Sequence, residues 1–248
     1  MSTLHIVIPV FNERGTLAEL VQRVLQTTLP DGWDRLITLV DDCSSPSHFP
    51  AVQDLVNRLH AERKPLRFLR HEVNKGKGAA LQTGFDAILA SSAPSDDLVI
   101  IQDADLEYDP GDYASLMEPI IRGEADAVIG TRWGEHYQYK SLKHRVHAMG
   151  NGALTMLSNM MTGFRVSDME CCYKLMPVKV LRELRPMLSE QRFGIEPQII
   201  AGLGRLKKRV VQRPVKYDPR GLAAGKKIGW RDGVRALVVI TRERWRRN

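Results

Sequence analysis

The chain has 248 residues, of which 43% are hydrophobic and 26% are charged, a composition typical of a globular protein with a sizeable core. No stretch approaches the roughly 18 consecutive apolar residues of a membrane-spanning helix. The first residues, MSTLHIVIPV, lack the basic start and apolar run of a signal peptide. The three cysteines, Cys43, Cys171 and Cys172, have no Cys-x-x-Cys spacing, which argues against a disulfide framework or a zinc site. We therefore expect a cytoplasmic protein.

The net charge of +7 is unevenly distributed along the chain. Arg205 to Asn248 contains fifteen Lys and Arg against three acids, whereas the other 204 residues contain 21 against 26. A basic carboxyl end attracts phosphate, whether on nucleic acid, on anionic lipid or on a small substrate.

Short apolar runs alternate with helical stretches over the first half of the chain. In chain order we expect a strand at Leu4–Val10, a helix from Thr16 to about Thr28, a strand at Leu36–Val40, a helix at Phe49–Arg63, a strand at Leu66–Leu69, a helix at Gly78–Ser91, and strands at Leu98–Ile101 and Ala125–Ile129. Thr16-Leu-Ala-Glu19 has the spacing of a capping box. The alternation predicts an α/β fold, a parallel sheet with helices on both faces.

Ligands of such sheets bind outside the carboxyl ends of the strands. Four polar segments fall at those ends, and one cleft can hold them all: Pro9–Glu13, Asp41–Ser44, Asn74–Gly78 and Asp103–Glu107. The loop Asn74-Lys-Gly-Lys-Gly78 has two glycines and two cations ahead of a helix, which allows a phosphate or nucleotide to approach closely. A flexible turn is the simpler interpretation of this loop by itself. It does not fit the Rossmann fingerprint, and Gly221–Lys227 does not fit a P-loop.

The segment LVIIQDADLEYDP, from Leu98 to Pro110, places two acids directly after a buried strand. Asp103 and Asp105 are two residues apart and so project to the same side of an extended chain. Paired carboxylates suit a hard divalent cation such as Mg²⁺ or Mn²⁺, which usually completes its shell with water and substrate phosphates. Turn or helix-cap residues are the alternative.

Several motifs together resemble, in order and spacing, the family 2 glycosyltransferases. They are IPVFNE (Ile8–Glu13), LVDDCSS (Leu39–Ser45), NKGKGAALQTGF (Asn74–Phe85), QDADLEYDP (Gln102–Pro110) and GTR (Gly130–Arg132), followed by SDMECCYKL (Ser167–Leu175), FGIEPQI (Phe193–Ile199) and YDPRGLAAGKKIGWRDG (Tyr217–Gly233). Within that family the chain looks most like the dolichol-phosphate and polyprenyl-phosphate sugar transferases.

The resemblance implies a GT-A fold in one domain, a Rossmann-like, mostly parallel sheet flanked by helices. Residues 1–135 would bind the nucleotide sugar, 136–229 the acceptor, and 230–248 would form a basic amphipathic helix. The implied nucleotide-sugar residues are Pro9, Asn12, Glu13, Asp41, Asp42, Lys75, Asp103, Ala104, Asp105 and Glu107. Mg²⁺ or Mn²⁺ would be held by Asp103, Asp105 and Glu107, and Arg132 would lie near the donor sugar and phosphates.

The implied reaction moves a single hexose, with inversion, from GDP-mannose or a UDP-sugar to a polyprenyl phosphate. A phosphate monoester has a second pKa near ~6 and needs cations rather than a base, and the implied acceptor-phosphate residues are Arg145, Arg220 and Lys226. If the acceptor is a sugar hydroxyl instead, Asp168 is the candidate base. With Asp105 and Arg132, Asp168 completes the expected catalytic set.

The carboxyl-terminal helix, expected at Trp230–Arg247, could rest on the anionic cytoplasmic face of a membrane or pack against the domain. The Gln-x-x-Arg-Trp motif of processive synthases is absent, and so are the carboxyl-terminal membrane spans of many relatives. Two rival classes stay open: a nucleotidyltransferase, which should have a glycine-rich basic loop after the first strand, and a non-catalytic nucleic-acid-binding module, which would not explain acids at the sheet edge.

Overall fold

A computed structural model describes residues 1–13, 15–132, 150, 152–160, 165–219, 235, 238–239 and 241–243. The elements, in chain order, are β1 (Ser2–Val10), α1 (Thr16–Gln26), β2 (Trp33–Asp41), α2 (Phe49–Ala61), β3 (Leu66–Arg70), α3 (Lys77–Ala90), β4 (Leu98–Ile101), η1 (Pro110–Asp112), α4 (Tyr113–Ile121), β5 (Ala127–Thr131), β6 (Lys174–Pro177), α6 (Val178–Leu184), η2 (Arg185–Met187), α7 (Ile195–Arg205) and β7 (Val210–Pro214). Residues 152–160 are also helical.

The strands form one seven-stranded sheet in the order β3-β2-β1-β4-β6-β5-β7. All neighbours pair in parallel except β6, which is antiparallel to both β4 and β5. The amino end of a reversed strand meets the carboxyl ends of its neighbours. The residues that precede β6 therefore arrive at the same edge as those that follow β1, β2 and β4.

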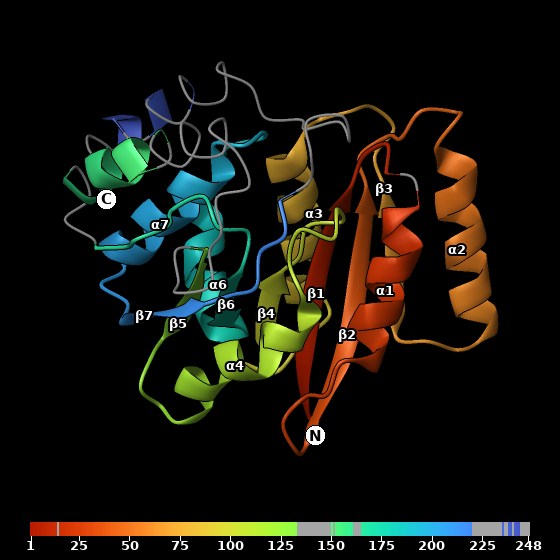
Figure 1. Cartoon of the computed structure of the whole chain (residues 1–248), viewed down its shortest axis with the longest axis horizontal. Coiled ribbons are helices and arrows are strands. Elements are labelled where there is room, and N and C mark those ends of the chain that lie inside the picture. The colour runs from red at the N-terminus through yellow and green to blue at the C-terminus, as the bar shows by residue number, and fades with distance from the viewer. Residues whose placement is uncertain are drawn as a thin grey trace.

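Helices cover both faces of the sheet, with α1 and α4 on the near face in Figure 1 and α3 on the far face. The core consists of the apolar strand residues and the inward faces of these helices, and all four residues of β4 are buried. Burial on both faces explains why β4 has no polar alternation in sequence. The fold is α/β with a mostly parallel sheet, as predicted.

The first five strands and three helices of the expected order are all present, with ends that differ by a few residues. The capping-box prediction at Thr16 is wrong, because Gly15, at φ 76°, is the residue that precedes α1. The Thr16 hydroxyl instead donates to Glu13 Oε2 at 3.1 Å, and Glu19 pairs with Arg23 one turn later. The strands β6 and β7 were not predicted.

Most of the expected carboxyl-terminal helix lies outside the described residues, but 235, 238–239 and 241–243 are helical. Val239 and Glu243 are buried, and Glu243 pairs with Arg205 of α7 at 2.6 Å and accepts a hydrogen bond from Gln198. At these positions the segment packs against the domain, the second of the two expectations. Within the described ranges, no helix is both long and apolar enough to cross a membrane.

Candidate active site

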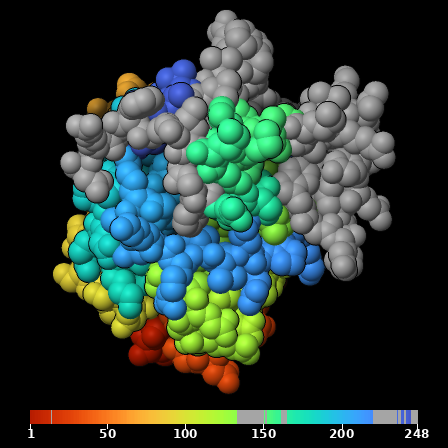
Figure 2. Space-filling view, turned by 90° about the vertical axis from the view of Figure 1, so that its left-hand side faces the viewer, coloured from red at the N-terminus to blue at the C-terminus, as the bar shows by residue number. Residues whose placement is uncertain are grey.

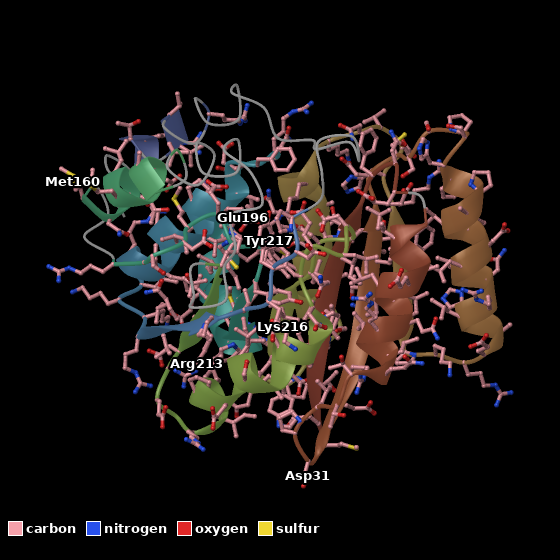
Figure 3. The ribbon with its side chains drawn as sticks, viewed as in Figure 1. Asp31, Met160, Glu196, Arg213, Lys216 and Tyr217 are labelled. Atoms are coloured by element: carbon pink, nitrogen blue, oxygen red, sulfur yellow. The ribbon has the colours of Figure 1, made fainter. Side chains whose placement is uncertain are left out.

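A cavity of about 300 Å³ opens at the edge of the sheet where the parallel strands end. The four predicted segments all contribute to its lining, through Pro9, Val10, Phe11, Glu13, Asp42, Asn74, Gly76, Lys77, Asp103, Ala104, Asp105 and Glu107. The second half of the chain adds Arg132, Glu170, Arg192, Phe193, Glu196 and Tyr217. Figure 3 shows Glu196 and Tyr217 at the centre of the molecule. The structure thus assembles one cleft from both halves of the chain.

The two aspartates after β4 are held in place by buried side chains behind them. Gln102 is fully buried, and its Oε1 accepts hydrogen bonds from the hydroxyls of Tyr113 and Tyr173 at 2.7 and 2.8 Å. Its Nε2 donates to the carbonyl of Asp103 at 3.0 Å, which fixes the backbone where the strand ends. Leu106 then turns the chain with a left-handed φ of 62°, a conformation found mostly at turns and functional loops.

Lys77, a residue that the sequence did not single out, pairs with the first of these two aspartates. Its Nζ lies 2.7 Å from Asp103 Oδ1 and 3.0 Å from Glu196 Oε1. Burial lowers the pKa of Lys77, but the two carboxylates outweigh it and hold the pKa well above the usual value. An ammonium group that is charged at all relevant pH values therefore lies in the cavity beside Asp103.

Asp42 organises the loop that the sequence identified as a phosphate-approach loop. Its two carboxylate oxygens accept hydrogen bonds from the backbone amides of Lys75 and Gly76, at 2.8 and 2.6 Å, and from Asn74 and His71. Because both oxygens are occupied, Asp42 acts on the site mainly by shaping this loop. The Lys75 side chain is exposed and does not line the cavity, whereas Lys77 does.

Asn12 and Asp41 lie just behind the cavity wall. Asn12 links the loops after β1 and β2. Its side-chain Oδ1 accepts a hydrogen bond from the Ser45 backbone amide, and its backbone amide donates to the Ser44 hydroxyl. Asp41 is fully buried, with Oδ2 bound to the Ser44 amide and to Arg70. Its Oδ1 has no hydrogen-bond partner in the described part of the chain.

Arg132 and Asp168 form a buried, two-pronged ion pair. Arg132 Nε and Nη2 donate to the two oxygens of Asp168 at 2.8 and 2.7 Å, and the Arg132 amide donates to Oδ2 at 2.9 Å. Burial lowers the pKa of Arg132, but its partners outweigh this effect and raise the pKa above the usual value. Asp168 is 0% exposed and does not line the cavity. This geometry favours a role in orienting Arg132 over the predicted role as base.

Tyr217 joins the two sides of the cavity. Its hydroxyl donates to Glu107 Oε2 at 2.9 Å, its ring lies 5.2 Å from that of Tyr108, and the Arg132 guanidinium lies 5.2 Å from its centre. Tyr217 was known from sequence only as the start of a longer motif. The structure places it between the acids after β4 and the Arg132 guanidinium.

Glu170 and Glu196 are cavity carboxylates that sequence reasoning did not assign. Glu196, in the first turn of α7, is buried between Lys77 and the fully buried Lys174 of β6. Glu170 precedes β6. Burial and, next, the negative charge of Glu196 raise the pKa of Glu170 to about 7, against the opposing effect of Lys174, Arg132 and Lys77.

Two of the three residues expected to bind a divalent cation are suitably placed to do so. Asp103 and Asp105 are partly exposed to the cavity and offer the carboxylate oxygens that Mg²⁺ and Mn²⁺ prefer. No group of three or more His, Cys, Asp or Glu residues within the described ranges is arranged to hold a metal ion, and Glu107 is engaged by Tyr217. The expected three-carboxylate set is therefore not assembled, and two carboxylates completed by substrate phosphates are the arrangement that fits.

The predicted acceptor-phosphate residues Arg145, Arg220 and Lys226 lie outside the described residues. The thiols of Cys171 and Cys172 are buried and free, and burial raises the pKa of Cys171 to about 12. These cysteines are packing residues that connect the loop before β6 to the sheet.

Solved structures with the same fold are glycosyltransferases of the GT-A class. The glucosyl-3-phosphoglycerate synthase of Mycobacterium tuberculosis, crystallised with Mn²⁺, UDP and phosphoglyceric acid, aligns over 100% of this chain and 80% of its own, with a TM-score of 0.65 and 17% identity. The same enzyme with Mg²⁺ and UDP gives a TM-score of 0.66 at 18% identity, over 98% of this chain and 79% of its own. The fold is therefore that of the GT-A glycosyltransferases.

The chain belongs to glycosyl transferase family 2, whose model matches residues 5–185. A UDP-N-acetylglucosamine–dolichyl-phosphate N-acetylglucosaminyltransferase of Methanococcus voltae is 23% identical over 95% of both chains. An undecaprenyl-phosphate mannosyltransferase of Micrococcus luteus is 25% identical over 96% of this chain and 92% of its own. A dodecaprenyl-phosphate galacturonate synthase of Rhizobium johnstonii is 27% identical over 81% of this chain, which spans 54% of that relative's length.

Proposed function

We propose that this glycosyltransferase moves a single sugar from a nucleoside diphosphate sugar to a polyprenyl phosphate, with inversion at the anomeric carbon. The observation that supports the donor site most directly is the cavity at the sheet edge, which is lined by Asp103 and Asp105 together with the cations Lys77 and Arg132. Relatives that match nearly the whole chain and are named for dolichyl-phosphate and undecaprenyl-phosphate acceptors support the choice of acceptor.

The residues divide into donor-binding and charge-stabilising groups. The loops after β1 and β2 and the loop shaped by Asp42 form the wall on which the nucleotide would lie. Asp103 and Asp105 would hold the divalent metal, which supplies positive charge beside the departing diphosphate when bound. Lys77 and Arg132 are fixed cations on the cavity wall, and preorganised charges of this kind stabilise negative charge as it develops on the leaving group.

A phosphate acceptor fits the behaviour of Asp168. The second ionisation of a phosphate monoester lies near ~6, so the attacking oxygen is already negative at neutral pH. No base is then required, and Asp168 is left to hold Arg132. A sugar-hydroxyl acceptor, the alternative, would need a base with free access to the cavity. Asp168 is 0% exposed, so the base would have to be a carboxylate that lines the cavity, such as Glu170.

Peripheral contact with an anionic membrane surface would let the cavity reach a lipid acceptor. The helical residues 152–160 lie on the surface beside β7 (Figure 2), and Met156 and Met160 on this segment are 63% and 70% exposed. Met156 and Met160 are one helical turn apart and so share one face of this segment, which would be the face that meets the membrane interface. Sedimentation with anionic and with neutral vesicles tests this point.

The donor site is tested by a thermal-shift panel of UDP, GDP, CDP, TDP and ADP, with and without Mn²⁺. A ligand at a hundredfold excess over Kd stabilises the protein by about 2.7 kcal/mol, which raises the unfolding temperature measurably. We expect one nucleotide to stabilise the wild-type chain in a metal-dependent way and to lose this effect in Asp105→Asn. Asp96→Asn, whose side chain is 83% exposed, is the matched control. Absence of a response to all five nucleotides contradicts the proposal.

A further inference from the structure

Seven acidic side chains line the cavity, and six of them have direct partners in the protein. Glu13 accepts from Thr16, Asp42 from its loop, Asp103 from Lys77, Asp105 from the Glu107 amide, Glu107 from Tyr217, and Glu196 pairs with two lysines. Glu170 makes no hydrogen bond or ion pair with any other described residue, although it lines the same cavity. Its carboxyl group is therefore available to a ligand.

The backbone on either side of Glu170 is fixed. Two residues before it, Asp168 is held by Arg132, and two residues after it, the Cys172 amide donates to the Tyr108 hydroxyl at 3.2 Å. The neighbouring side chain of Met169 is fully buried. A carboxyl group on a rigid segment, without protein partners, has the preorganisation that a ligand-binding group requires.

The charges that face Glu170 indicate which ligand group it takes. Glu196 on α7 is negative, whereas Lys174 on β6, Arg132 after β5 and Lys77 on α3 are positive. Both lysines already share Glu196, Lys77 also pairs with Asp103, and Arg132 is bound to Asp168. A second carboxylate beside Glu196 repels a phosphate group, whereas a neutral hydroxyl donates a favourable, charge-assisted hydrogen bond to it.

We propose that the Glu170 carboxylate accepts a hydrogen bond from a hydroxyl group of the transferred sugar and thereby selects and orients that sugar in the cavity. This inference rests on the proposed function, because it assumes that the cavity binds a nucleoside diphosphate sugar. It assigns Glu170 to the sugar and leaves the nucleotide to the residues described above. Glu170 is then a specificity-determining residue that distinguishes the donor from the plain nucleotide.

The test is calorimetric titration of wild-type, Glu170→Ala and Glu170→Gln protein with UDP and GDP, and with UDP-glucose, UDP-N-acetylglucosamine and GDP-mannose, all with Mn²⁺. We expect Glu170→Ala to weaken binding of the preferred nucleotide sugar by about ten- to a hundredfold, the range for loss of a charged hydrogen bond. Binding of the matching nucleoside diphosphate should change less than about twofold. The affinity of Glu170→Gln for the nucleotide sugar should lie between those of wild-type and Glu170→Ala protein, because glutamine keeps the shape of the side chain but loses its charge.

A second readout separates this role from a structural one. The affinity of the wild-type chain for the nucleotide sugar should rise between pH 6 and 8, as the Glu170 carboxyl ionises, by more than in Glu170→Gln. Glu118→Ala, on the exposed surface of α4, is the matched control for removal of a glutamate.

Three results overturn the inference. In the first, Glu170→Ala weakens binding of the nucleotide and of the nucleotide sugar equally. In the second, it changes the binding of neither. In the third, it leaves binding unchanged but abolishes turnover, which would make Glu170 a base for a hydroxyl acceptor. Failure of the proposed function has a different signature, since the wild-type chain would then bind no nucleoside diphosphate at all. The wild-type titration with UDP and GDP therefore comes first.

Discussion

Replacement of Gly78 by alanine should separate the two segments that close the cavity. Gly78 lies at the start of α3, where an added Cβ would lie 2.2 Å from the Glu190 carbonyl oxygen and 2.8 Å from that of Arg192. Both are backbone atoms and cannot rotate away. The segment 190–192 must therefore shift. Two hydrogen bonds that its carbonyls accept would break, one from the Ala79 backbone amide at 2.9 Å and one from Gln82 Nε2 at 2.8 Å.

The expected loss of unfolding free energy is about 1–5 kcal/mol. Overpacking costs about 1–3 kcal/mol and each lost hydrogen bond about 0.5–1.5, while the better helix propensity of alanine returns about 0.5–1. Urea unfolding followed by circular dichroism measures the change. Gly152→Ala is the control, because no atom of the described residues lies within 4 Å of its added Cβ, and it should leave stability unchanged or slightly higher. Equal stability of the two variants would refute the reasoning.

Three further predictions concern the charged groups of the cavity. Asp168→Asn should lower the unfolding free energy by about 3–5 kcal/mol, because it leaves Arg132 buried without its partner. A double-mutant cycle with Arg132→Met should show strong coupling between the two residues. If Asp168 acted only as a base, Asp168→Asn would lose activity without either effect. Lys77→Met should lower the unfolding free energy by about 2–4 kcal/mol, because Asp103 and Glu196 lose a shared cation, while the exposed Lys75→Met should change it little in the same urea titration. The pKa of Glu170 is raised from 4.5 to about 7, so the folded state holds this proton more tightly than the unfolded state does. As pH rises from 4.5 to 7, the unfolding free energy of the wild-type chain should therefore fall by about 1–3 kcal/mol relative to that of Glu170→Gln. The same pH dependence of unfolding in both proteins would contradict this.

The sequence located the half of the cavity that is formed by the segments after β1, β2 and β4, because its signals are local. Asp103 and Asp105 follow a strand that is recognisable from its short apolar run. Because parallel strands bring their carboxyl ends to one edge of the sheet, the residues after these strands are expected in one cleft. What local pattern could not decide is which of two nearby cations faces the site. Lys75 and Lys77 are both lysines flanked by glycine in the same loop, so the sequence does not distinguish them. Which of them faces the cavity depends on where α3 begins.

The other half of the cavity depends on long-range pairing. Glu170 reaches the site because it precedes β6, which runs antiparallel between β4 and β5, and a strand of four residues gives little periodicity to recognise. Glu196, on α7, pairs with Lys174 of the same strand. The pairing of Asp168 was not visible in the sequence for a related reason. Its partner Arg132 is 36 residues away, so no local pattern reveals the ion pair that holds the Asp168 carboxylate.

The carboxyl-terminal segment is connected to the same cavity. Arg235 and Arg242 both pair with the buried carboxylate of Glu190, at 3.0 and 2.7 Å. Glu190 belongs to the segment that packs against Gly78 and accepts from Gln82 through its carbonyl. The described part of the basic carboxyl end therefore contacts the 190–192 segment, which in turn packs against the start of α3.

The measurement that tests the central claim most directly is transfer of a radiolabelled sugar. The purified chain is incubated with Mn²⁺, the nucleotide sugar that it binds best, and either a polyprenyl phosphate or the corresponding neutral polyprenol in detergent. The account predicts a lipid-linked product with the phosphate acceptor, little with the neutral alcohol, and loss of the product in Asp105→Asn. Transfer to neutral hydroxyl acceptors with none to the polyprenyl phosphate would contradict it.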